Sequence, residues 1–120
     1  MALDIKTRHS GEVLVLELIG DLRAGRPLGT LLSATEAALG SKPETAGIVL
    51  NVAGLFTSDS AGIAELVQLF TVAKKRGLNV AMAGAGKRLM DVLQITRVDS
   101  FFPQHADEAG AVAFFAKKPA

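Results

Sequence analysis

The sequence predicts one α/β domain over residues 1–120, in which an N-terminal antiparallel hairpin precedes alternating helices and strands. Residues 47–52 and 78–83 are short apolar runs of the kind that form buried strands, and a helical pattern separates them. A helix between two strands lets the second run in the same direction as the first, so the central strands should pair in parallel. With the hairpin, this predicts a mixed sheet of four to five strands and about four helices.

The strands are expected where short apolar or alternating runs lie between turn residues. They are 3–8, 13–19, 47–52 and 78–83, with a further edge strand at 98–102. A turn at Ser10–Gly11 joins the first two strands, and Gly20 and Asp21 end the second. Pro103 should stop the edge strand, because proline cannot donate to a sheet ladder.

The helices are expected where apolar residues recur every three or four positions. They are 27–39, 60–76, 86–95 and a last one that begins near Asp107 and Glu108. Pro27 suits a first helical turn, whereas Gly40 and Gly77 suit the ends of the first and second helices. A loop at 53–59 should separate the strand at 47–52 from the second helix.

Composition indicates a compact domain of a reducing compartment such as the cytoplasm. The chain is 49% hydrophobic with no Trp or Tyr, and it has no cysteine, which excludes disulfides and thiolate metal sites. No cluster of His, Asp and Glu has metal-ligand spacing, so no metal or cofactor is expected. A formal net charge of +1 argues against direct nucleic-acid binding. Neither a signal peptide nor an apolar run of the ~18 residues that span a bilayer is seen, so no membrane insertion is expected.

Two stretches resemble motifs of enzymes but depart from their spacing. Residues 84–88 (GAGKR) would lie between a strand and a helix, yet Ala81 replaces the first glycine of a Walker loop and Arg88 its Ser or Thr. Residues 58–62 (SDSAG) resemble a hydrolase nucleophile elbow, which needs its serine directly after a strand rather than after a loop. We therefore expect no catalytic residues and no enzymatic activity.

Residues 57–62 (TSDSAG) are the candidate functional motif. The hydroxyls of Ser58 and Ser60 should lie near the start of a helix, where unpaired N–H groups and the helix dipole favour negative charge. A phosphate there would be tolerated by the fold and would change what the surface binds. Taken alone, Ser58, Asp59 and Ser60 are more typical of an ordinary helix N-cap than of a switch.

The context of this motif carries more information than the motif itself. The relevant segments are 48–52 (IVLNV), 54–58 (GLFTS), 59–63 (DSAGI), 74–80 (KKRGLNV) and 87–90 (KRLM). With these segments the chain resembles, over nearly its whole length, the STAS domain family and within it the anti-sigma-factor antagonists. The resemblance implies a STAS-like fold and a cytoplasmic bacterial regulator of transcription. Such a domain sequesters a serine-kinase anti-sigma factor when unmodified, and phosphorylation ends that interaction.

The resemblance also implies roles for individual residues. Ser60, the serine after the Asp, should be the phosphorylated residue and Asp59 its motif partner, with Thr57 and Ser58 as less expected sites. Gly62 has no side chain, so it should leave the Ser60 hydroxyl open to a partner. The expected partner-binding residues are Arg23, Asp59, Ser60, Ala61 and Gly62. A phosphatase is a further candidate partner.

Arg23 departs from the family pattern. Antagonists commonly read Gly-x-Leu-Asp at the end of the second strand, where residues 20–23 are GDLR. A basic group thus replaces an acidic group that should face the partner. The identity of the partner is therefore left open. A different kinase fits, and so does an accessory STAS subunit of a stressosome-like scaffold or of a membrane transporter complex, in which Ser60 only caps a helix.

Overall fold

The computed structural model of the protein describes residues 3–22 and 30–116. The strands are β1 (Asp4–Ser10), β2 (Val13–Leu22), β3 (Gly47–Ser58), β4 (Asn79–Ala83) and β5 (Gln104–His105). The helices are α1 (Thr30–Ser41), α2 (Ser60–Lys75), α3 (Lys87–Ile95) and α4 (Glu108–Ala116), with a short 3-10 helix, η1 (Asp99–Phe101). None of the described helices is both long enough and apolar enough to cross a membrane.

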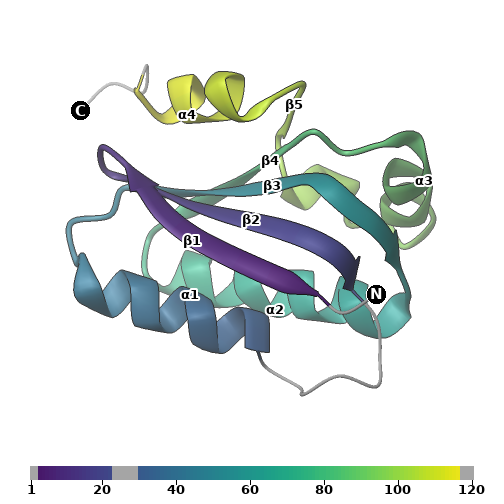
Figure 1. The fold of residues 1–120 in the computed structure, drawn as a ribbon, viewed down its shortest axis with the longest axis horizontal. Coiled ribbons are helices and arrows are strands. Elements are labelled where there is room, and N and C mark those ends of the chain that lie inside the picture. The colour runs from purple at the N-terminus through teal and green to yellow at the C-terminus, as the bar shows by residue number, and fades with distance from the viewer. Residues whose placement is uncertain (1–2, 23–29, 117–120) are drawn as a thin grey trace.

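The strands form one five-stranded mixed sheet in the order β1-β2-β3-β4-β5. The hairpin β1–β2 is antiparallel, whereas β2, β3, β4 and β5 pair in parallel. This confirms the predicted fold class. Helices α1 and α2 cover one face of the sheet, α4 lies across part of the other face, and α3 lies beside the far end of β3 (Figure 1).

The core has two layers because both faces of the sheet are partly covered. Alternate residues of β2, such as Leu14, Leu16 and Leu18, face α1 and α2 and are fully buried. The intervening Val13 and Val15 belong to a smaller cluster beneath α4. Figure 1 shows α4 over only the half of the sheet nearest the β1–β2 turn.

The largest correction to the prediction concerns β3, which continues to Ser58 rather than ending at Val52. No loop therefore occupies 53–59. The second strand also continues past Gly20, to Leu22, and two register shifts between β2 and β3 let the paired strands extend together. Gly20, with φ of 111°, adopts a backbone conformation that favours glycine and lies at one of these shifts.

The predicted edge strand at 98–102 is also wrong. Residues 99–101 form η1, and the edge strand β5 follows Pro103. The reason is aromatic packing: Phe102 is 1% exposed, and the ring of Phe101 stacks on Phe70 at 4.8 Å. The carbonyl of Pro103 accepts a hydrogen bond from the Met82 amide, so this proline opens the short strand instead of stopping one.

The predicted helices are present with shifted ends. α1 continues to Ser41, so that Gly40 lies inside the helix rather than at its cap. α3 and α4 begin within a residue of the predicted positions, at Lys87 and Glu108. The proposed start of the first helix at Pro27 lies outside the described residues.

Candidate functional site

The candidate site is the start of α2, where Asp59 is the N-cap residue. Its backbone is extended, with φ −111° and ψ −176°, and its Oδ1 accepts a hydrogen bond from the Gly62 amide at 2.9 Å. The Asp59 carbonyl accepts the first intrahelical bond, from the Ile63 amide at 3.0 Å. Ser60 is therefore the first helical residue, one position after the cap and two after the end of β3.

Gly62 fixes this helix start against the end of β2. A Cβ atom at Gly62 would lie 2.0 Å from the carbonyl oxygen of Leu22. This oxygen belongs to the backbone, so relieving the clash would require the strand or the helix to shift. The same Leu22 oxygen accepts a hydrogen bond from the Asp59 amide at 3.3 Å. Gly62 is buried. Its role in the fold is close packing of the helix on β2. That the missing side chain also leaves the Ser60 hydroxyl open to a partner stays a prediction.

The other hydroxyl residues of the motif have different placements. Ser58 is half-buried at the end of β3, its Oγ donates a hydrogen bond to the Asp59 carbonyl at 3.3 Å, and it lies 2.6 Å from the position of a Gly62 Cβ. Thr57 is in β3 and Ser60 is in α2, but their side chains lie outside the described part of the chain. Ala61 is half-buried, and Arg23, directly after Leu22, is among the undescribed residues.

The charges on α2 suit an anion at its start. Its first turn carries no acidic side chain beyond the cap, and its last turn carries Lys74 and Lys75. Cations at a helix C-terminus and anions at the N-terminus both interact favourably with the helix dipole. The cap itself is one such anion, because the Asp59 carboxylate accepts the Gly62 amide hydrogen bond at the helix start.

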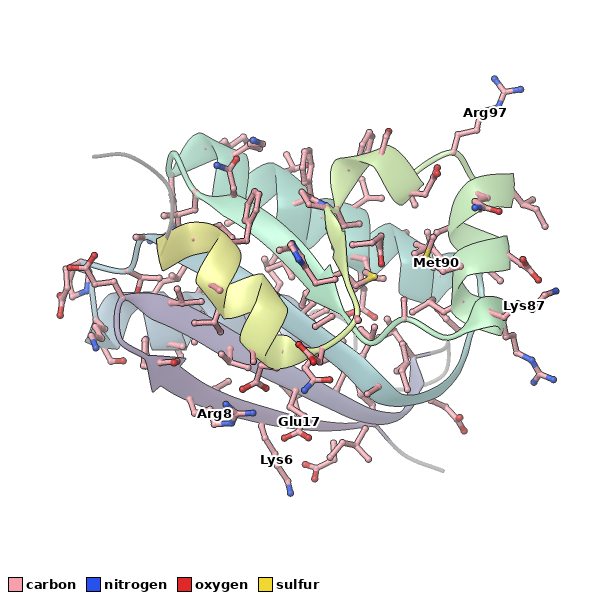
Figure 2. The ribbon with its side chains drawn as sticks, turned by 90° about the horizontal axis from the view of Figure 1, so that it is seen from above. Lys6, Arg8, Glu17, Lys87, Met90 and Arg97 are labelled. Carbon is pink, nitrogen blue, oxygen red and sulfur yellow. The ribbon has the colours of Figure 1, made fainter. Side chains whose placement is uncertain are left out.

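The glycine-rich segment 84–86 is a turn between β4 and α3. Gly84 has φ of 77°, and a Cβ there would lie 2.9 Å from the Ala53 Cβ, so glycine is needed both for the turn and for its packing on β3. Gly86 is the N-cap of α3 without a side-chain hydrogen bond. Lys87, at the start of α3, and Arg97, two residues after its end, project into solvent (Figure 2).

The expected loop at 53–59 was an argument against a nucleophile elbow, which needs its serine directly after a strand. That argument no longer holds, because a single residue separates β3 from α2. The chain's two histidines nevertheless lie on the outer strands, His9 on β1 and His105 on β5, whereas Ser60 follows the central strand β3. Within the described residues, no group of three or more His, Asp or Glu side chains is arranged to hold a metal ion.

A polar network that the sequence analysis missed holds α4 on the sheet. Arg8 of β1 donates two hydrogen bonds to the Glu108 carboxylate, at 2.6 and 2.5 Å, and Asn51 of β3 donates a third at 3.0 Å. Figure 2 shows Arg8 together with Lys6 and Glu17 on the two strands of the hairpin. The sequence hinted at this network through Asn51, a polar residue in an otherwise apolar strand. Its partner Glu108, however, lies 57 positions away.

This network makes the stability of the fold pH-dependent. The hydrogen bonds from Arg8 hold the pKa of Glu108 below its ordinary value. The unfolded chain therefore binds this proton more strongly than the folded one, so the stabilisation is present above the ordinary pKa and is lost as pH falls through the lowered one. We expect Glu108→Gln to cost about 1 kcal/mol at neutral pH, and less at about pH 4 and below.

Denaturant titrations at neutral and acidic pH measure this effect. Glu44→Gln is the matched control, because Glu44 is exposed in the loop after α1 and should leave stability unchanged at both pH values. An equal loss for Glu108→Gln at both pH values would contradict the assignment of the titration to this carboxylate.

Comparison with known proteins identifies the family to which this domain belongs. A family model of the STAS domain matches residues 4–111. The chain belongs to the STAS domain family. A search of curated protein sequences finds no match to it.

Solved structures resemble the chain in fold at low sequence identity. An anti-sigma-factor antagonist (STAS) domain protein from Planctomyces limnophilus has a TM-score of 0.80 at 20% identity, covering 94% of this chain and 98% of that one. An anti-sigma factor antagonist from Mycobacterium paratuberculosis has a TM-score of 0.70 at 18% identity, covering 97% of this chain and 96% of that one. The murine Solute Carrier 26 family member A9 anion transporter has a TM-score of 0.72 at 12% identity, covering 92% of this chain and 19% of that one.

Proposed function

We propose that this protein is a cytoplasmic anti-sigma-factor antagonist that regulates sigma-factor-dependent transcription without an enzymatic activity of its own. Unmodified, it binds a serine-kinase anti-sigma factor; phosphorylated on Ser60, it releases that partner. The observation that carries the proposal is the Asp59-capped start of α2, with Ser60 as the first helical residue, two positions after the end of the central strand β3. Membership of the STAS family and the fold similarity to antagonist proteins support the class of function.

The geometry of the helix start supports Ser60 over its neighbours as the switch. The Ser58 hydroxyl is half-buried and hydrogen-bonded to the Asp59 carbonyl, so a phosphate on it would have to break that contact beside Gly62. A phosphate on Ser60 would instead lie within the first helical turn, where negative charge is favourable. Its charge of about −1.5 to −2 would then oppose a close, charge-matched protein interface.

Phosphorylation mapping tests the site. Incubated with the kinase and ATP, the protein should gain one phosphate on Ser60, located by mass spectrometry of its peptides. Ser60→Ala should abolish the modification, whereas Ser58→Ala should retain it. Phosphate confined to Thr57 or Ser58 would move the switch away from the helix start.

Arg23 is the expected determinant of which partner binds. In the sequence it directly follows Leu22, whose carbonyl oxygen accepts a hydrogen bond from the Asp59 amide at the start of α2, and this supports the proposal. Arg23→Asp should leave the thermal midpoint nearly unchanged, as surface substitutions do, and should change partner affinity at low salt. Affinity that is unchanged within error would put Arg23 outside the interface.

An accessory subunit of a stressosome-like scaffold or of a membrane transporter complex is the second candidate function. The similarity in fold to the murine anion transporter is the observation behind it. In that function Asp59 and Ser60 would serve only to begin α2. The proteins that copurify with the chain distinguish the two candidates.

A further inference from the structure

A groove lies at the β4–β5 edge of the sheet, between α2 and α4. Its volume is about 330 Å³. Aromatic rings line it from three elements: Phe70 of α2, Phe101 of η1 and Phe114 of α4. The polar residues among its described lining are Lys74, Asn79 and Ser100, and Val80 and Pro103 also line it. Nothing in the proposed switch uses these residues.

The aromatic lining is ordered by internal contacts yet faces solvent. Phe70 and Phe101 stack with ring centroids 4.8 Å apart, and Phe102 meets Phe70 edge-on at 5.8 Å from the core side. Phe101 remains 36% exposed and Phe114 40% exposed. Two large apolar side chains thus stay in contact with water at one groove, where a flat ligand could cover them.

Lys74 gives the groove a single positive charge. It is the only ionisable side chain among the described residues that line it. Its ammonium donates a hydrogen bond to the Asn79 Oδ1 at 2.6 Å and lies 5.6 Å from the centre of the Phe70 ring. These contacts hold the cation at the edge of the aromatic lining, and an ammonium has three donors, so donors remain for an anion.

We propose that this groove binds a small aromatic monocarboxylate, with its carboxylate on Lys74 and its ring against Phe101 and Phe114. One lysine matches one negative charge, and the volume lies at the small end of the range for small-molecule sites. Lys74 lies 14 residues after Ser60 on the same helix, which is about 21 Å along its axis, so the site is separate from the switch. The inference does not rest on the proposed function.

Indole-3-acetate is a suitable probe, because a chain without Trp or Tyr leaves the indole fluorescence unobscured. Titration of the full chain should show saturable one-to-one binding with a Kd of about 0.1–1 mM. The uncharged indole-3-acetamide has nearly the same shape and should bind about fivefold more weakly. Absence of saturation, or equal affinity for acid and amide, would overturn the proposal.

Matched variants locate the site. Lys74→Met should weaken the acid about fivefold and leave the amide unchanged, whereas Lys75→Met, one residue along α2 and outside the groove lining, should change neither. Phe101→Ala should weaken both probes, as should Phe114→Ala, which leaves the Phe70 stack intact. Ile95→Ala is the apolar control, since Ile95 is 81% exposed on α3. Equal losses for Lys74→Met and Lys75→Met would show diffuse charge attraction and contradict the site.

Discussion

Gly62→Ala is expected to destabilise the protein by about 2 kcal/mol or more, although alanine is the better helix former. The added methyl group would lie 2.0 Å from the Leu22 carbonyl oxygen, so the first turn of α2 would have to move away from β2. That movement would also strain the Asp59 amide hydrogen bond to the same oxygen. Thermal and denaturant unfolding of the purified variant measure the loss.

Gly40→Ala is the matched control for this prediction. Gly40 also lies inside a helix, but a Cβ there meets no atom within 4 Å. The substitution should therefore stabilise the protein by up to about 1 kcal/mol through helix propensity alone. If both alanine variants were as stable as the wild type, α2 would not approach β2 as closely as the structure shows.

Ser60→Asp is expected to separate binding from folding. An acid in the first turn of a helix is favourable, so the free energy of unfolding should change by less than about 1 kcal/mol. Affinity for the anti-sigma factor should nevertheless fall at least ~10-fold, or about 1.4 kcal/mol. Titration calorimetry with the purified partner measures this change.

Two further variants make the result specific to Ser60. Ser60→Ala should retain binding and should no longer respond to kinase and ATP. Ser33→Asp adds the same charge at an exposed position of α1 and should bind as the wild type does. Wild-type affinity for Ser60→Asp would mean that charge at the helix start does not control the interaction.

The parts of the fold that the sequence predicted are those set by local patterns. The apolar run at 47–52 and the periodic helices gave the parallel centre of the sheet, and the alternating N-terminus gave the hairpin. The full length of β2 was missed because Gly20 and Asp21 resemble the end of a strand, and β3 was expected to end with its apolar run at Val52. Register shifts between β2 and β3 let both strands continue beyond these positions, and such pairing depends on contacts between distant segments.

Long-range contacts also explain what was missed at the site. The Asp-Ser pair of residues 59–60 was located from its neighbours in sequence, because capping is local. The need for glycine at position 62 comes from the close carbonyl oxygen of Leu22, which is 40 positions earlier in the sequence. The pairing of Arg8 with Glu108 spans 100 positions, and no periodicity connects them.

Recovery of partners from a native lysate tests whether the unmodified Ser60 state binds an anti-sigma factor. Wild-type protein should retain a serine-kinase anti-sigma factor, identified by mass spectrometry, and Ser60→Asp should lose it while Ser33→Asp keeps it. Transporter or scaffold subunits retained equally by wild type and Ser60→Asp, with no kinase in either sample, would contradict the account.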